Sequence, residues 1–359
     1  MLRLAQLRRS VPFALRSVAA CAALIVSVGV NNFAQAQTTV EPPSPNRYLP
    51  GAEGVPRRYV LPRENEGVGG LLDLIRGRNG NGEVEPRINL DPGPVFTEDV
   101  RGYDDLLDWT PQLMPDGLVY RSYLAGVKEP RMASTFDYDS QQGWLWDITL
   151  GGRVGVFRFG TEDPVRPEGF EIDLEGAAMP RLDLDRDRDL LAVDFRAGVP
   201  ITYGIGPWST KVAFYHLSSH VGDEFLARNP GFTRINYSRN VFVFGQSYYV
   251  HHDVRVYGEV GYATYTDVAE PWEFQFGLDY SPLATTGIFA SPFLAINTQL
   301  RQEVNFGGNV VVQAGWQWRP QENGKLLRIG VQYYNGKSNQ FSFYNENENK
   351  VGAGIWYDY

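Results

Sequence analysis

The stretch from residue 303 to residue 318, EVNFGGNVVVQAGWQW, decides how this chain folds. Its even positions are mostly apolar or aromatic, namely Val304, Phe306, Gly308, Val310, Val312, Ala314, Trp316 and Trp318. Its odd positions are mostly polar or small, namely Glu303, Asn305, Gly307, Asn309, Val311, Gln313, Gly315 and Gln317. Successive side chains of a β-strand point to opposite faces, so this period of two predicts a strand with one apolar face and one polar face.

The same alternation recurs at 144–151, 191–199, 272–280 and 327–334. A soluble β-sandwich also has alternating strands, but its strands need not be as long as a tilted membrane crossing, which takes about 10 residues. These strands reach that length, carry Trp and Tyr at their ends, and have a polar face rich in Gly and isolated charges. Those features favour an all-β fold, a transmembrane antiparallel β-barrel.

The number of strands and the far end of the barrel also follow from the sequence. Residues 117–359 hold about 12 strands if each strand and its turn take roughly 20 residues, and bacterial barrels prefer even numbers. The alternation continues through Val351 and Ile355 to Tyr359, an aromatic final residue. Such an ending is typical of the insertion signal of outer-membrane barrels, so we expect the barrel-insertion machinery as a partner.

The residues before the barrel form two expected segments. Residues 1–36 resemble a signal peptide, because four arginines precede an apolar run at 18–30 and Ala34-Gln35-Ala36 fits a cleavage site. Residues 37–116 are rich in Pro and Gly and are expected to form a periplasmic linker or a plug segment. The expected location is the outer membrane of a bacterial cell, reached by export with cleavage of the signal peptide.

Composition excludes several classes of protein. The formal net charge of −9 argues against a nucleic-acid partner, which would need a basic stripe. A single cysteine supports neither a disulfide framework nor a zinc ribbon. The mean hydropathy of −0.30 argues against a bundle of membrane-spanning helices, each of which needs about 20 apolar residues.

One polar pair interrupts an apolar strand face. In 207–219 the even side begins with Trp208 and Val212 and then carries His216 and Ser218, so this side should face lipid with the pair near the outer leaflet. A histidine can deprotonate a serine two positions away, and a third group must orient its imidazole. We select Asn236 on the following strand as that group, with Ser238 and Asn240 as alternatives.

His216-Leu217-Ser218, followed by a loop that ends at 234–239, resembles the catalytic motif of outer-membrane phospholipase A. That resemblance implies a twelve-stranded barrel whose His-x-Ser pair and neighbouring Asn hydrolyse acyl esters on the outer face. The lipid A deacylases have a similar His-x-Ser pair. This sequence departs from both families, because Ser219 stands where they have Asn.

Most of the chain after the expected signal peptide resembles an uncharacterised bacterial barrel family, domain of unknown function 1207. The resemblance is clearest in the segment 216–224, His-Leu-Ser-Ser-His-Val-Gly-Asp-Glu. The sequence therefore leads to one enzymatic hypothesis, an acyl-ester hydrolase of phospholipase or lipid A deacylase type acting on outer-leaflet lipid. It requires His216 Nε2 to approach Ser218 Oγ on the outer face.

Three alternatives remain beside the hydrolase. A non-enzymatic barrel would be a narrow pore or a structural envelope protein, with Arg255, Glu259, Glu273, Asp279, Arg328 and Asp194 inside it. A binding module would use residues 37–116. A metal site would use His220, Asp223 and Glu224, with Ca²⁺ as the ion; no cofactor is required by the sequence. The substrate and the oligomeric state stay open.

Overall fold

The computed structural model describes residues 109–359, apart from 267, 285, 287 and 321–323. The expected signal peptide at 1–36 and almost all of the expected extension at 37–116 lie outside the described residues. No helix among the described residues is long and apolar enough to cross a membrane.

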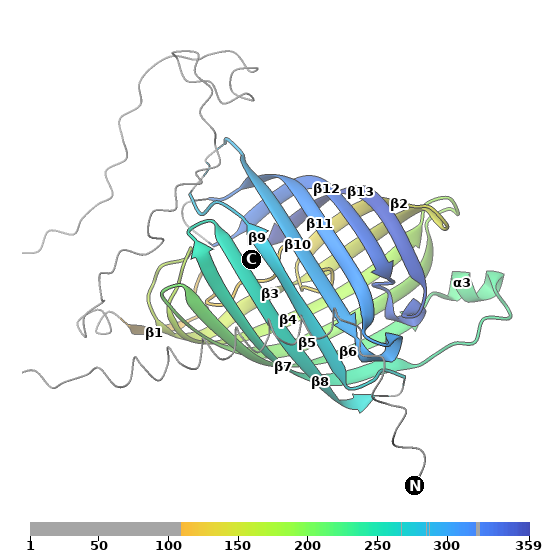
Figure 1. Cartoon of the computed structure of the whole chain (residues 1–359), viewed down its shortest axis with the longest axis horizontal. Coiled ribbons are helices and arrows are strands. Elements are labelled where there is room, and N and C mark those ends of the chain that lie inside the picture. The colour runs from red at the N-terminus through yellow and green to blue at the C-terminus, as the bar shows by residue number, and fades with distance from the viewer. Residues whose placement is uncertain (1–108, 267, 285, 287, 321–323) are drawn as a thin grey trace, which may run out of the picture. The chain divides into compact units, whose positions relative to one another are not determined.

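Twelve antiparallel strands close into a barrel (Figure 1). Consecutive strands pair from β2 to β13, and β13 pairs with β2 to close the ring. Their bounds are β2 Met132–Asp139, β3 Gly143–Gly160, β4 Gly169–Asp183, β5 Asp189–Ile205, β6 Trp208–Val221, β7 Tyr237–His251, β8 Val254–Thr266, β9 Trp272–Tyr280, β10 Ser291–Arg301, β11 Gly307–Trp318, β12 Leu326–Lys337 and β13 Asn347–Asp358. The predicted fold class and strand number are confirmed.

One short strand lies beyond the ring. β1, Thr110–Leu113, pairs with the last residues of β3, which extends past its pairing with β2. Three short helical turns complete the described elements: α3 Asp223–Arg228, η2 Gln302–Val304 and η3 Phe341–Phe343.

The alternation of the sequence separates the two faces of the barrel wall. Large apolar side chains such as Val331, Trp316 and Phe242 are exposed on the outer face, at 61%, 59% and 54%. The six charged residues assigned to the lumen from the sequence face inward, and five of them are buried. An apolar wall around a charged interior is the reverse of a soluble protein and fits a membrane barrel.

The stretch that predicted the fold forms a strand over a shorter range than expected. β11 begins at Gly307, whereas residues 302–304 form the turn η2. Asn305 and Phe306 have φ values of 57° and 56°, in the left-handed region that ends a strand. The alternation did not reveal this turn, because Val304 and Phe306 are apolar and even-numbered, like the outward-facing residues of the strand that follows.

The segment 114–131, between β1 and β2, runs through the inside of the barrel. Tyr120, Tyr123 and Ala125 are fully buried there. The segment therefore fills the lumen, and the first strand of the ring begins at Met132 instead of near the expected boundary at 117. Its position explains why residues 117–131 show no period of two.

Strands of the wall hold this segment through polar contacts along its length. Lys128 Nζ pairs with Asp194 Oδ2 at 2.5 Å, and Tyr123 donates to Glu259 Oε2 at 2.7 Å. Arg328 donates to the backbone carbonyl of Leu124 at 3.0 Å. Since Asp194, Glu259 and Arg328 lie on three different strands, the segment ties separate parts of the wall together.

Two long loops, the connections after β6 and after β12, lie at the same end of the barrel, opposite β1 (Figure 1). The connection after β6 carries α3, and its Phe225 and Phe232 both pack against Phe343 of the β12–β13 loop, with ring centroids 5.1 and 5.7 Å apart. Both loops therefore lie at the end of the barrel near which the sequence placed His216 and Ser218. The loop 338–346 also bends into the lumen, where Phe341 is fully buried.

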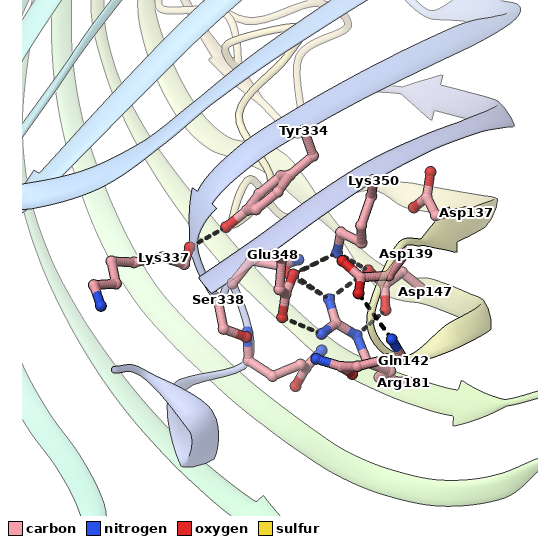
Figure 2. A network of polar contacts seen from close by, with 12 residues as sticks. Asp137, Asp139, Gln142, Asp147, Arg181, Tyr334, Lys337, Ser338, Glu348 and Lys350 are labelled. Atoms are coloured by element: carbon pink, nitrogen blue, oxygen red, sulfur yellow. Dashed lines mark hydrogen bonds and ion pairs between the residues drawn. The ribbon is translucent and has the colours of Figure 1, made fainter. Parts of the chain in front are cut away.

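A network of ion pairs lies beneath this loop (Figure 2). Arg181 contacts Asp147 and Glu348, each at 2.5 Å, and Lys350 contacts the same two carboxylates at 3.0 and 2.8 Å. Arg181 also donates to Asn339 of the loop. The network joins β3, β4 and β13 to the loop, so this end of the lumen is closed by charges as well as by aromatic rings.

Candidate active site on the outer face

β6 and β7 place the predicted residues on the outer face of the wall. His216 is exposed and Ser218 partly exposed, whereas their odd-numbered neighbours Leu217 and Ser219 are buried. The pair stands five and three residues before the end of β6 at Val221, near the end that carries the long loops. The side chains therefore occupy the face and the level of the wall that the sequence predicted.

The orienting contact comes from Asn240. Asn240 lies directly opposite His216 in the antiparallel pairing of β6 and β7. Its Oδ1 is 2.7 Å from Nδ1 of His216. An amide oxygen only accepts hydrogen bonds, so in the neutral ring Nδ1 carries the proton and Nε2 is the acceptor. This tautomer leaves Nε2 as a proton acceptor, which is what a general base needs.

Ser218 shares the outer face with His216 but is not yet joined to it. The described residues include no hydrogen bond between the His216 ring and Ser218 Oγ. The side chains project from positions two apart on the same face of one strand, and the hydrolase hypothesis needs a rotamer in which they meet. Catalytic hydrogen bonds are often long before substrate binds.

Asn236, the group selected from the sequence, is exposed and precedes the first residue of β7. The structure brings Asn240, one of the two alternatives, to His216 instead. The register explains the difference, because Ser219 pairs with Tyr237 and thereby sets Asn240 against His216. Sequence alone did not give that register, since the intervening loop contains the helix α3.

Aromatic side chains border the polar patch on two sides. Phe214 and Phe242 pack together at 5.2 Å on the side toward the middle of the wall. Phe195 meets the ring of His220 edge-on at 5.9 Å on the other side. The patch therefore interrupts an otherwise apolar surface, which is costly in lipid unless the polar groups pair or act.

The expected alternative metal site is not formed by the described residues. They contain no group of three His, Cys, Asp or Glu side chains placed to hold an ion. Asp223 and Glu224 are exposed in the first turn of α3, while His220 packs against Phe195. Calcium takes six to eight oxygen ligands, and this set does not fit it.

Sequence reasoning missed the contacts that close the lumen. Asp194 is their centre, because Lys128, the backbone N–H of Phe341 and the hydroxyl of Ser219 all reach its carboxylate. Buried acidic residues on a luminal face were predicted, but two of the partners of Asp194, Lys128 and Phe341, lie 66 and 147 residues away in the sequence. The signal that identifies 118–131 is its lack of alternation together with seven apolar residues.

The closed antiparallel ring, with its apolar outer wall and charged interior, defines the class of this protein as an outer-membrane-type β-barrel. More particularly, the chain belongs to the family described as protein of unknown function (DUF1207), whose model matches residues 105–359. The family resemblance inferred from the sequence is thus confirmed. No curated protein matches the chain.

Several solved barrels are similar to the chain at low identity. Outer membrane phospholipase A from Escherichia coli aligns with a TM-score of 0.44 and 11% identity, over 63% of this chain and 89% of that chain. The Salmonella typhi outer membrane phospholipase dimer with bound calcium gives 0.43 and 12%, over 63% and 90%. The KdgM porin in complex with disordered oligogalacturonate gives 0.38 and 10%, over 64% and 98%. The fold assignment rests on the strand pairing itself.

Proposed function

We propose that this barrel hydrolyses acyl esters of outer-leaflet lipid, with Ser218 as nucleophile, His216 as general base and Asn240 as orienting group. The single observation that carries the proposal is the 2.7 Å contact between His216 Nδ1 and Asn240 Oδ1 on the outer face. It fixes the tautomer in which Nε2 is free to accept a proton, beside a serine on the same strand face.

The chemistry follows from that tautomer. Nε2 of His216 takes the proton of Ser218 while the serine oxygen attacks the ester carbonyl carbon. The alcohol of the lipid then leaves with the proton from His216, and the acyl group stays on Ser218. Water, deprotonated by His216, cleaves this acyl-enzyme and releases a fatty acid.

We further propose that the protein reaches the outer membrane by export with cleavage after Ala36, and that barrel-insertion machinery and outer-leaflet lipid are its partners. N-terminal sequencing of the protein recovered from outer-membrane fractions tests this. Gln37 as the first residue supports the proposal, whereas recovery with Met1 intact or from inner-membrane fractions contradicts it.

The test of the reaction is fatty-acid release from mixed micelles of phospholipid or lipid A by the purified full chain. S218A and H216A should each lower the rate by at least about 100-fold. His252, an exposed histidine in the turn at the opposite end of the barrel, gives the matched control, and H252A should keep the wild-type rate.

Two results would overturn the hydrolase proposal. One is a wild-type protein that releases no fatty acid from either lipid although its barrel is folded. The other is an H216A protein that is as active as the wild type. The first result would favour the non-enzymatic envelope protein, the alternative that the sequence kept open. The second would show that His216 is not the general base.

A further inference from the structure

A second charged region lies at the end of the barrel opposite the long loops. A small cavity of about 30 Å³ there is lined by Arg121 of the luminal segment, Arg255 of β8 and Arg319, which follows β11. Three aspartates, Asp253, Asp279 and Asp358, line the same cavity. The balance of charge around it depends on which of these groups are already paired.

The aspartates are largely engaged by other groups. Asp279 pairs with Arg255 at 2.5 Å. Asp358 is shared between Arg131 and Arg328, at 2.9 Å from each. Asp253 Oδ1 accepts the backbone N–H of Leu283 at 3.1 Å. Among the described residues, Asp279 and Asp358 are therefore each paired with arginines other than Arg121 and Arg319.

The two arginines left over are Arg319 and Arg121. Arg319 is 1% exposed. Among the described residues its Nε has no partner, and its other guanidinium nitrogens make only long contacts to Ser281 Oγ at 3.3 Å and to the Gly324 carbonyl at 3.5 Å. Arg121 donates to the backbone carbonyl of Val165. Neither forms an ion pair with any carboxylate in the part of the chain that the structure describes.

A buried charge without a counter-charge is costly, and two guanidinium groups lining one cavity repel each other. Burial, together with the nearby charge of Arg121, lowers the pKa of Arg319 to about 9. An anion between the two groups would relieve both costs. Arginine favours phosphate because its planar fork of N–H groups matches two phosphate oxygens.

A larger cavity adjoins the smaller one at Arg121. It measures about 170 Å³ and shares Arg121 and Tyr249 with the smaller cavity. It reaches the β5–β6 turn, where Ile205, 40% exposed on the outer wall, and Trp208 line it. The cavity therefore joins a cationic interior to the rim of the apolar wall, as the headgroup of a membrane lipid would require.

The acidic residues of the larger cavity do not neutralise Arg121. Asp163 Oδ1 accepts the backbone N–H of Val165 at 2.8 Å, and Glu168 Oε1 accepts that of Gly206 at 3.0 Å. Both carboxylates thus hold the loop 161–168 and the β5–β6 turn in place, and Arg121 remains available to a ligand.

From this geometry we infer that this end of the barrel binds a phosphate-bearing anion through Arg121 and Arg319. The site is separate from the outer-face patch at His216 and does not depend on the proposed hydrolysis. The phosphate belongs either to a lipid headgroup at the rim or to a free phosphate ion, and both offer the same oxygens to the two arginines.

The full chain in uncharged detergent micelles provides the test. Its thermal unfolding midpoint is followed while sodium phosphate is added against sodium chloride of equal ionic strength, and in a second arm while short-chain phosphatidylglycerol is added. We expect a saturable rise with phosphate groups and none with chloride. Half-saturation at a lower concentration of phosphatidylglycerol identifies a lipid headgroup, and a rise with inorganic phosphate alone identifies a free ion.

The variants R121Q and R319Q should each raise the half-saturating concentration by about tenfold or more, since hydrogen bonds to charged groups are worth about 1.5 to 3 kcal/mol. R186Q, at an exposed arginine of the opposite end, is the matched control and should behave as wild type. If R319Q does not fold, the half-buried R121Q alone decides. The inference is overturned if R121Q responds to both phosphate ligands as the wild type does, or if chloride is equally effective.

Discussion

At the scale of single residues, His216 and Asn240 show how strand pairing can make a chemical group. Neither residue is unusual in the sequence. They become a pair because opposite positions of an antiparallel ladder bring their side chains within a few ångströms of each other. The candidate site thus depends on register, and a substitution that keeps the register but removes the amide tests it directly.

Replacing Asn240 by alanine should lower lipid-ester hydrolysis by about 100-fold, because the His216 ring loses the partner that fixes its tautomer. N236A should retain most of the activity, since Asn236 precedes β7 and Asn240 already occupies Nδ1. Initial rates of fatty-acid release measure both. Equal losses in the two variants would return the orienting role to the sequence-based choice, Asn236.

Arg181 illustrates a different residue-scale effect, in the lumen. R181M leaves the partly buried Asp147 and the buried Glu348 with one cation, Lys350, in place of two (Figure 2). Removing one partner of a buried ion pair costs about 3 to 5 kcal/mol, so the free energy of unfolding in urea should fall by that amount. R186A removes an exposed arginine as a control and should cost under about 1 kcal/mol. Similar losses in both would show that the luminal network contributes no stability of its own.

At the scale of elements, each strand presents two surfaces with opposite requirements. β12 exposes Val331 and Ile329 outward, while Arg328 and Gln332 point into the lumen. A shift by one residue would exchange these faces and place charges in lipid. The alternation therefore fixes the register of the wall more firmly than any single contact does.

The outer face of β12 gives an element-scale prediction. V331R places a charge at the middle of an apolar wall, and we expect it to lower the free energy of unfolding in lipid vesicles by about 2 to 4 kcal/mol. L113R, at an exposed leucine of β1 beyond the ring, should have little effect. If V331R is no more costly than L113R, this face of β12 does not contact lipid.

At the scale of the whole molecule, the barrel is filled. The segment 114–131 occupies the lumen from one end, and the loop 338–346 enters from the other. Both meet at Asp194, which binds Lys128 and the backbone N–H of Phe341. The pore alternative therefore faces a lumen that its own chain obstructs.

We expect the wild-type protein to give no stable conductance steps in planar lipid bilayers. A variant with residues 118–129 replaced by a Gly/Ser segment of equal length should leak ions, because it removes Lys128 and the buried tyrosines from the lumen. Porin-like conductance steps from the wild type would contradict the obstructed lumen, and a variant that stays closed would assign the obstruction to the loop 338–346.

The sequence by itself determined the all-β class, the number of strands, the face of each strand that points outward, and the place of His216 and Ser218 on that face. These follow from the alternation of apolar and polar residues, because successive side chains of any pleated strand point to opposite faces. The reversal at Asn305 and Phe306 escaped it, because an apolar residue in a turn keeps the same parity.

Only the tertiary structure decided which residue pairs with His216, which segment fills the lumen, and which arginines form no ion pair with the described carboxylates. Each of these depends on groups distant in sequence, such as Lys128 and Asp194, which are brought together when the ring closes. When the barrel closes, the register of the strands and the enclosed volume are fixed together. The alternation of a single strand predicts neither of them.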